Sequence, residues 1–415
     1  MSVLDMFRKN TIKEVDVVNN EQYEREYTSK KVGTLEIPDK LTNENSFVLA
    51  NTVAEIYHPI DFLADRASKL RFFIADKNGN EVQVTELNRF ITDINPFYSF
   101  NDLVYQYLFS LLSDGNSFTY LGVPSSSEKI TPNTITRCDI LIPNLVNLTE
   151  YRNMSILGVS NRNDLVRKFT YELDKTLELN KLRINTYDPV LRPDSILLSR
   201  SPLFKSVRSV NNLLATYSAR YNIYVNNGSA GYLVNDKKQT GSNIADVIDP
   251  TTREDMLKDI NNRNGITGNR NLWGVSSIPL KFINTLSTIK DLLPFEETLD
   301  DSIKIAGTYQ LPSGLVLRKD QSTFDNKNTD EKSVWENALI SLVNTTCETF
   351  TRIFGIDALK YSIKADYSSV SVLKENEASK EDIKTKKIDN LLKIKQLSPD
   401  LDIEKEIKLI LSSNE

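Results

Sequence analysis

Residues 95–116, NPFYSFNDLVYQYLFSLLSDGN, contain the clearest structural signals in the chain. Ser99 is a suitable N-cap, because its hydroxyl can accept a hydrogen bond from a backbone N–H in the first turn of a helix. Apolar side chains then recur at helical spacing as far as Leu112, and Asp114-Gly115-Asn116 closes the pattern. This stretch therefore predicts a helix between a proline-containing loop and a β-rich segment that begins at Ser117.

The sequence on either side alternates between helical and strand-like patterns. Between residues 47 and 70 the apolar positions have helical spacing despite Pro59. Arg71 begins a predicted strand that turns at Asn78-Gly79 and returns over residues 82–84, since glycine tolerates the positive φ of tight hairpin turns. Further strand-like stretches lie at 117–123, 139–141, 166–173 and 196–198. Together these patterns predict a mixed α+β body.

Two long helices are predicted further along the chain. The first begins at Ser201-Pro202-Leu203, where a proline in the first turn is tolerated, and ends at Asn226-Asn227-Gly228. The second runs from about Thr288 to Gly307 and leads into Tyr309-Gln310-Leu311-Pro312. Between them, strand-like stretches at 231–234, 271–275 and 278–283 and a helical stretch at 253–261 predict a compact β-α-β-β insert.

The charges on these two helices are opposite in sign, which predicts that the helices pack side by side, within one subunit or between subunits. Such pairs would set the register of packing more than its stability, because an exposed ion pair contributes only about 0–1 kcal/mol. The candidate residues are Lys205, Arg208 and Arg220 on the first helix and Glu296, Glu297, Asp300 and Asp301 on the second.

The remaining segments differ in character. Residues 1–45 are polar and charged and predict an extended arm. Residues 310–330 are loop-like, 330–355 have the apolar spacing of a helix, and 361–373 alternate like a strand. The Lys/Glu-rich segment from residue 377 to the end again has helical spacing.

Composition limits the classes of protein that this chain can represent. Its 415 residues are long enough for two or three domains, and a net charge of -5 argues against a protein that binds nucleic acid by broad phosphate neutralisation. Cys138 and Cys347 are far apart, so neither a disulfide framework nor a thiolate zinc site is indicated. The sequence predicts neither a secretion leader nor an apolar run of the roughly 18 to 20 residues that span a bilayer.

The chain offers little material for catalysis. His58 is the only histidine, so a His-based triad or metal site is not expected, and no cofactor is predicted. The segment Gly265-Ile266-Thr267-Gly268 is interpreted as a turn, because the Gly-Lys-Ser/Thr of a phosphate-binding loop does not follow it. The carboxylates between residues 296 and 301 could hold Mg²⁺ in a nuclease, although an acidic, solvated helix face explains them more simply.

Taken in order, these segments resemble the portal proteins of tailed bacteriophages. The helix closed by Asp114-Gly115-Asn116, the helix from Pro202, the insert, the acidic helix and the loop after Pro312 follow one another as in that family. Each motif is weak alone, but the order and spacing are fairly specific. The resemblance covers about residues 47–375.

The resemblance implies a portal-like α+β fold with named parts. Leu311-Pro312-Ser313 departs from the Val-Pro-Pro type of element common in the family, and the segment after Leu373 has no assignable counterpart. The implied parts are an N-terminal arm (1–45), a wing in two pieces (46–201 and 331–374), two stem helices (202–227 and 286–309), a clip (228–285), a tunnel loop (310–330) and a helical C-terminal crown (375–415).

A portal protein would form a closed ring, usually of twelve subunits, at one vertex of an icosahedral capsid. The resemblance implies a channel for packaging and ejecting double-stranded DNA, and contacts with the terminase large subunit, a head–tail adaptor, and the major capsid and scaffold proteins. It places the chain in the virion after assembly in the host cytoplasm, with neither enzymatic activity nor a membrane contact. The alternatives are another ring component of the phage head or neck and a metal-dependent nuclease or terminase subunit.

Candidate contacts follow from this resemblance. Arg318, Lys319 and Gln321 in the loop after Pro312 are candidates for touching DNA, with ordinary loop polarity as the competing explanation. A channel through which DNA slides should hold phosphate weakly, which suits an acidic protein with scattered basic residues. At the clip interface the candidates are Trp273, Arg253 and Arg270, with packing inside the clip as the competing explanation for the tryptophan.

Overall fold

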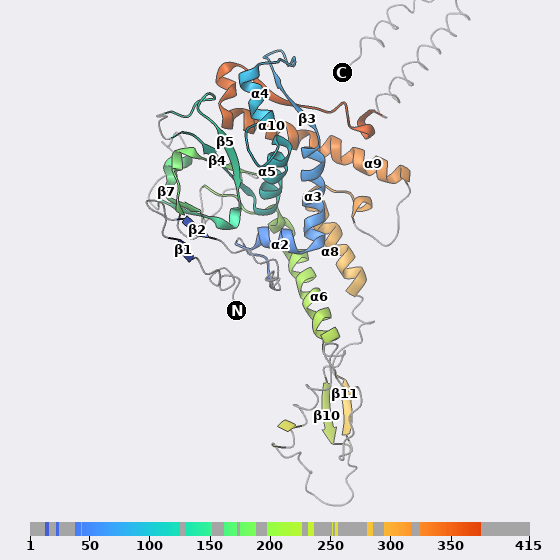
Figure 1. The fold of residues 1–415 in the computed structure, drawn as a ribbon. Coiled ribbons are helices and arrows are strands. Elements are labelled where there is room, and N and C mark those ends of the chain that lie inside the picture. Colours follow the sequence, from blue (N-terminus) through green and yellow to red (C-terminus); the bar gives the residue numbers. More distant parts are fainter. Residues whose placement is uncertain are drawn as a thin grey trace, which may run out of the picture. The chain divides into compact units, whose positions relative to one another are not determined.

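Figure 1 shows a computed structural model of the chain. The structure describes residues 38–42, 44–124, 129–151, 162–171, 175–187, 197–225, 294–316 and 324–374, and the short segments 13–15, 22–24, 231–235, 251, 254–255 and 280–284. The chain divides into two compact units. The larger unit contains Tyr57–Pro202 and Ala306–Glu415, and the smaller contains Met1–Ile56 and Leu203–Ile305.

Helix α5 (Phe100–Asp114) lies at the centre of the larger unit, and its ends are those that the sequence predicted. The Ser99 hydroxyl accepts a hydrogen bond from the backbone N–H of Asp102, and the Asp102 carboxylate accepts one from the backbone N–H of Ser99. This reciprocal capping box satisfies two donors that the helix itself leaves open. At the other end Gly115 adopts φ +87°, the left-handed conformation that ends many helices.

Two small antiparallel sheets pack around one apolar cluster. The first has the order β5 (Arg137–Leu141), β4 (Asn116–Gly122), β9 (Leu182–Thr186). The second has the order β6 (Val146–Glu150), β7 (Val166–Tyr171), β8 (Lys175–Thr176). Their shared core is formed by Phe118, Leu141, Val166, Phe169, Leu182, Ile184 and Leu197.

The predicted strands at 117–123, 139–141 and 166–173 are confirmed with small shifts of their ends. The strand predicted at 196–198 is wrong for the residues described, because Leu197 and Leu198 lie outside regular structure. Leu197 is instead buried in the core between the sheets, so its apolar character reflects packing rather than strand pairing.

Strand β3 (Arg71–Ala75) has a partner that the sequence did not indicate. The turn at Gly79 forms, with φ +84°, but only Glu81 makes an isolated bridge, to Ala75, and residues 82–84 form no return strand. β3 pairs instead with β12 (Ser362–Asp366), antiparallel and almost 300 positions away in the chain. The predicted strand at 361–373 therefore ends at Asp366, and residues 371–374 are helical.

Aromatic side chains join elements of the larger unit to α5. Residues 46–68 form α2 (Ser46–Thr52) and α3 (Ala54–Ser68), which contains Pro59 as predicted, and α4 (Thr85–Thr92) follows. Ring contacts join Phe72 to Phe100, Phe100 to Phe350, and Phe90 to Phe354, with centroids 5.2, 5.2 and 4.7 Å apart. These rings fasten β3, α4 and α5 to the helix before Gly355.

That last helix begins earlier than predicted. Residues 324–328 were interpreted as loop, but α9 (Phe324–Val334) already includes them. A π-helical turn (η7, Trp335–Leu339) leads into α10 (Ile340–Phe354), which ends at Gly355 with φ +68°. Short 3-10 helices occur at η2 (Pro143–Leu145), η3 (Arg162–Leu165), η4 (Leu179–Lys181), η6 (Ser313–Leu315) and η8 (Ile356–Leu359).

The smaller unit contains two long helices. A 3-10 segment η5 (Pro202–Ser206) precedes α6 (Val207–Val225), so the predicted helix opens with a tighter first turn. The second is α8 (Pro294–Thr308), and its predicted start near Thr288 lies outside the residues that the structure describes. Strand β10 (Gly231–Asn235) pairs with β11 (Leu280–Asn284), and β1 (Lys13–Val15) pairs with β2 (Gln22–Glu24), both antiparallel.

Candidate functional site

The turn after α5 has no room for a side chain. An ideal Cβ placed on Gly115 would lie 2.2 Å from the carbonyl oxygen of Arg200. The backbone N–H of Tyr187 donates to the carbonyl of Gly115 at 3.0 Å, so the turn is held from a second direction. Since φ is also positive, glycine is the residue that this position requires.

The residues beside Gly115 hold the segment that leads to Pro202. The Asn116 side chain pairs with the backbone of Ser199 in both directions, accepting from its N–H at 2.7 Å and donating to its carbonyl at 2.9 Å. The Ser201 hydroxyl donates to the carbonyl of Ser113 at 2.5 Å. All four residues are buried, so these hydrogen bonds fix the start of η5 against the end of α5.

The segment after α8 meets the same end of α5. The Tyr309 hydroxyl donates to the carbonyl of Leu112 at 3.0 Å, and the tyrosine is only 2% exposed. Burial raises the pKa of this hydroxyl well above its ordinary value, so it remains a donor at neutral pH. We call residues 112–116, 199–201 and 309 the Gly115 junction. Three motifs that the sequence presented only in order are therefore in contact within the larger unit.

A second support lies at the base of the predicted tunnel loop. The Nε2 atom of His58, in α3, bonds the carbonyl oxygen of Leu315 in η6 at 2.9 Å, so the nitrogen is the donor. On the other side an ideal Cβ on Gly314 would lie 1.8 Å from Oδ2 of Asp330 in α9. We call His58, Gly314, Leu315 and Asp330 the loop base. Nothing in the sequence around His58 indicated this contact.

The helices on the two sides of the loop base are tied by charge. Arg66 of α3 pairs with Glu331 of α9 at 3.2 Å, and its guanidinium lies 5.4 Å from the ring centroid of Phe62. The arginine side chain is 39% exposed, so solvent screening leaves this pair worth about 0–1 kcal/mol. The hydrogen bond between His58 and Leu315 therefore contributes more to holding the loop base than this ion pair does.

The candidate DNA contacts directly follow this base. Val316 is the last residue described before these candidates, and the description continues with α9 from Phe324. That Arg318, Lys319 and Gln321 contact DNA remains a prediction. Candidates whose side chains lie outside the described residues are Arg318, Lys319, Gln321, Trp273, Arg253, Arg270, Glu296 and Glu297.

The described charges of α6 and α8 make local contacts. Arg220 donates to the Thr298 hydroxyl at 3.2 Å, which links α6 to α8 inside the smaller unit. Asp300 pairs with Lys304 on its own helix at 2.5 Å, and this hydrogen bond raises the pKa of the lysine. Lys205 and Arg208 are exposed and Asp301 is buried. The predicted pairing of the two helices by charge stays a prediction.

Both cysteine thiols are buried. Burial raises the pKa of the Cys138 thiol, and it raises that of Cys347 to about 12, so neither thiol is a ready nucleophile at neutral pH. Within the described ranges no cluster of three or more His, Cys, Asp or Glu could hold a metal ion. None of the described helices combines the length and apolar character needed to cross a bilayer.

Comparison with known proteins decides the family. The sequence matches the phage portal protein family over residues 54–390, which is most of the chain. The chain belongs to the phage portal protein family. A search of curated proteins gave no significant match.

Solved structures show the same fold as this portal-family chain. One is the neck of a native gene transfer agent (GTA) particle computed with C12 symmetry, with 10% identity, a TM-score of 0.52, and coverage of 88% of this chain and 93% of that chain. Another is an HK97-family phage portal protein from Corynebacterium diphtheriae, with 10% identity, a TM-score of 0.51, and coverage of 78% and 95%. The mixed helix-and-strand architecture predicted from the sequence is therefore confirmed.

Proposed function

We propose that this portal-family chain forms a closed ring of twelve copies at one vertex of a phage capsid, as a structural part rather than an enzyme. The observation that carries the proposal is the family match over residues 54–390. The similarity to a neck computed with C12 symmetry supports the ring and its number of copies. The ring would be the channel for packaging and ejecting double-stranded DNA, within a virion assembled in the host cytoplasm.

The elements of the smaller unit suggest how the ring engages its partners. We assign α6 and α8 as the stem helices and the residues between them, including β10 and β11, as the clip. The clip would receive the terminase large subunit during packaging and a head–tail adaptor afterwards. Trp273, Arg253 and Arg270 are its candidate contacts. The wing, residues 46–201 and 331–374, would face the major capsid and scaffold proteins.

The stem helices would pack by complementary charge between neighbouring copies as well as within one. Lys205 and Arg208 are exposed, and in the ring they would face carboxylates of the next copy. Their candidate counterparts are Glu296, Glu297, Asp300 and Asp301. Because exposed ion pairs contribute little energy, their effect would be on register rather than on ring stability.

The tunnel loop would contact DNA weakly. The net charge of -5 disfavours a tight, extended hold on phosphates, since each neutralised phosphate adds to a salt-dependent affinity. Arg318, Lys319 and Gln321 would then be isolated contacts on a sliding duplex. The loop base supports this assignment, because it anchors Leu315, near the start of the loop, to α3.

Ring formation is tested by electron microscopy of the purified protein together with light scattering. Rings with a central channel wide enough for duplex DNA are expected. A monodisperse monomer or dimer that persists in the presence of capsid and scaffold proteins would contradict the proposal.

The DNA contact is tested by Arg318→Glu combined with Lys319→Glu. We expect normal rings but less packaged DNA, because the loop would then repel the phosphates. The matched control is Arg167→Glu with Lys168→Glu, an adjacent exposed Arg-Lys pair on β7, which should leave packaging unchanged. Unchanged packaging in the loop variant would contradict the assignment of Arg318 and Lys319 as DNA contacts.

A further inference from the structure

The π turn η7 joins α9 to α10 without interrupting the helical backbone. The backbone N–H of Ile340 donates to the carbonyl of Trp335, five positions back instead of the four of an α-helix. The backbone is helical on both sides, with φ −65° and ψ −42° at Val334 and φ −59° and ψ −46° at Ile340. Residues 324–354 contain neither glycine nor proline, so no helix-breaking residue imposes the π turn.

The helix after the π turn is fixed by aromatic side chains. Phe350 contacts Phe100 of α5, and Phe354 contacts Phe90 of α4. All four rings are buried. Because close-packed cores do not deform continuously, α10 has a single position against α4 and α5.

The helix before the π turn is held differently. Its residues Lys327–Ser333 include no apolar side chain that could pack in a core. Two polar contacts join this segment to other elements: Glu331 pairs with Arg66 of α3, and the carboxylate of Asp330 lies against Gly314 of η6. Rotation of α9 about its own axis would therefore exchange polar contacts and would not open a core.

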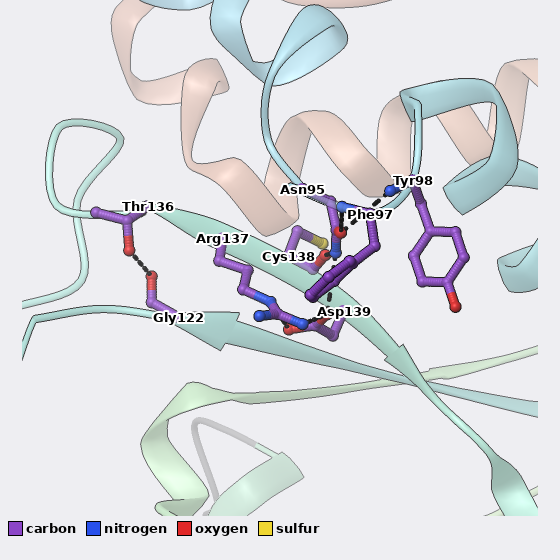
Figure 2. Close-up of polar contacts among 8 residues, drawn as sticks. All are labelled: Asn95, Phe97, Tyr98, Gly122, Thr136, Arg137, Cys138 and Asp139. Carbon is purple, nitrogen blue, oxygen red and sulfur yellow. Dashed lines mark hydrogen bonds and ion pairs between the residues drawn. The ribbon is translucent and has the colours of Figure 1, made fainter.

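The loop before α5 shows what a fixed polar attachment looks like (Figure 2). Asn95 is buried, its Oδ1 accepts from the backbone N–H of Phe97 at 2.9 Å, and its amide donates to the carbonyl of Cys138 in β5 at 2.7 Å. The side chain of Phe97 is 72% exposed although its backbone is held in this way. The pair of Arg66 and Glu331 is instead open to solvent, which competes for both side chains.

A buried donor at the π turn lacks an acceptor. Trp335 is 2% exposed, and its Nε1 makes no hydrogen bond with any residue that the structure describes. The indole lies edge-on to the ring of Tyr367, with centroids 6.4 Å apart, but the hydroxyl of that tyrosine donates to Oδ1 of Asn344. A buried N–H without an acceptor costs free energy, so the observed arrangement is not the most stable one that the contacts at η7 could give.

We propose that η7 is a register switch, through which α9 rotates while α10 stays in place. If the N–H of Ile340 bonded the carbonyl of Glu336, η7 would become α-helical. The helix before it would then turn by about 100° and shift by about 1.5 Å, which is the increment of one residue. Its use in packaging rests on the proposed function, because α9 follows the residues proposed to touch DNA.

The order of charges on α9 determines which register is favoured. In the shifted register Lys332 would take the place of Glu331 beside Arg66, and Glu331 would take the place of Asp330 beside Gly314. Arg66 attracts the glutamate and repels the lysine, so this ion pair selects the observed register. The switch is thus biased by one exposed pair, whose small contribution keeps the second register accessible.

Deletion of Asn337 tests the switch by removing the additional residue. Asn337 is exposed, and without it η7 should become a regular α-helical turn while Glu331 stays beside Arg66. We expect the amides of residues 335–340 to exchange at least about fivefold more slowly, measured by mass spectrometry, and normal rings to package less DNA. Asn337→Ala is the matched control, because it removes the same side chain but keeps the residue count, and it should match the unmodified chain.

An exchange of charges tests the register without a deletion. Glu331→Lys combined with Lys332→Glu places like charges beside Arg66 in the observed register and opposite charges in the shifted one. Exchange over residues 335–340 should again be slower, because η7 would become α-helical. Adding Arg66→Glu reverses the preference and should restore the exchange of the unmodified chain.

The outcomes separate this inference from the proposed function. Unchanged exchange in both the deletion and the charge-exchange variant would overturn the switch. Normal packaging by rings of the deletion variant would overturn its role in packaging and leave the portal function intact. Failure of the unmodified chain to form rings would overturn the proposed function, while the exchange measurements, which need neither rings nor DNA, would still decide whether η7 changes register.

Discussion

Gly115 and Gly314 both lie against a neighbouring group, but the groups differ in kind. At Gly115 the neighbour is the backbone carbonyl of Arg200, which is itself held by the buried bonds of Asn116 and Ser201. At Gly314 the neighbour is the carboxylate of Asp330, the end of a side chain that can rotate. The Gly115 junction is therefore a fixed support, and the loop base is an adjustable one.

This difference matches what the two regions would have to do in a portal ring. The Gly115 junction contains residues 199–201 and Tyr309, which precede and follow residues 203–305 of the smaller unit in the sequence, so a fixed geometry there would suit a portal subunit. The loop base precedes the residues proposed to touch moving DNA, where small rearrangements would be useful. The following substitutions test the contrast, from the largest expected effect to the smallest.

Gly115→Ala should destabilise the protein by about 3 kcal/mol, since it combines a positive φ with a clash against backbone. Chemical denaturation of the unassembled chain measures the effect. The control is Gly79→Ala, which shares a positive φ of +84° but has no atom within 4 Å of its Cβ and should cost only about 1 kcal/mol. Equal losses at the two positions would mean that the contact with Arg200 is unimportant.

Asn116→Ala should cost about 2 kcal/mol in the free energy of unfolding, because it leaves the buried N–H and carbonyl of Ser199 without their partner. Asn185→Ala provides the contrast, since the buried Nδ2 of Asn185 has no hydrogen-bond partner among the residues that the structure describes. That variant should change stability by less than about 0.5 kcal/mol. A smaller loss at Asn116 than at Asn185 would show that the junction is not held by this amide.

His58→Leu should lower the local stability of the loop base by about 1 kcal/mol, because the carbonyl of Leu315 loses its donor. Hydrogen exchange of the amides of residues 313–316 measures this as roughly fivefold faster exchange. His58→Gln retains a donor near the same place and should restore most of the protection. Unchanged exchange in the leucine variant would remove His58 from the loop base.

Gly314→Ala should change the free energy of unfolding by less than about 0.5 kcal/mol, because the Asp330 carboxylate can rotate away from the new methyl group. Combining it with Asp330→Ala should remove even this small cost, which a double-mutant cycle would detect as coupling. A loss as large as that of Gly115→Ala would mean that the loop base is as rigid as the junction.

Local signals made parts of this fold predictable. The cap at Ser99, the end of α5 at Gly115 and the end of α10 at Gly355 each depend on a few neighbouring residues, and all were readable in the sequence. The helix around Pro59 was predicted correctly, because the apolar spacing on both sides of the proline outweighed a single helix-disfavouring residue. The order of motifs was also enough to indicate the family, which the match over residues 54–390 confirmed.

Contacts between distant segments were not predictable in the same way. An Asn-Gly turn after β3 favoured a hairpin, but β12 offered a better partner from the other end of the chain. Residues 324–328 lack apolar spacing, so the sequence did not indicate that the helical region leading into α10 already begins at Phe324. In these contacts Asn116 and His58 bond backbone N–H and carbonyl groups, which carry no residue-specific signal.

The sequence by itself determined where α5 begins and ends and where α10 ends, and it indicated the family to which the chain belongs. Only the tertiary structure decided which strand pairs with β3, that Asn116 holds Ser199, and that Phe97 is presented to solvent on a rigid loop. The physical reason is that caps and periodicity act over a few residues, whereas pairing, burial and exposure depend on how segments far apart in the chain compete for the same neighbours.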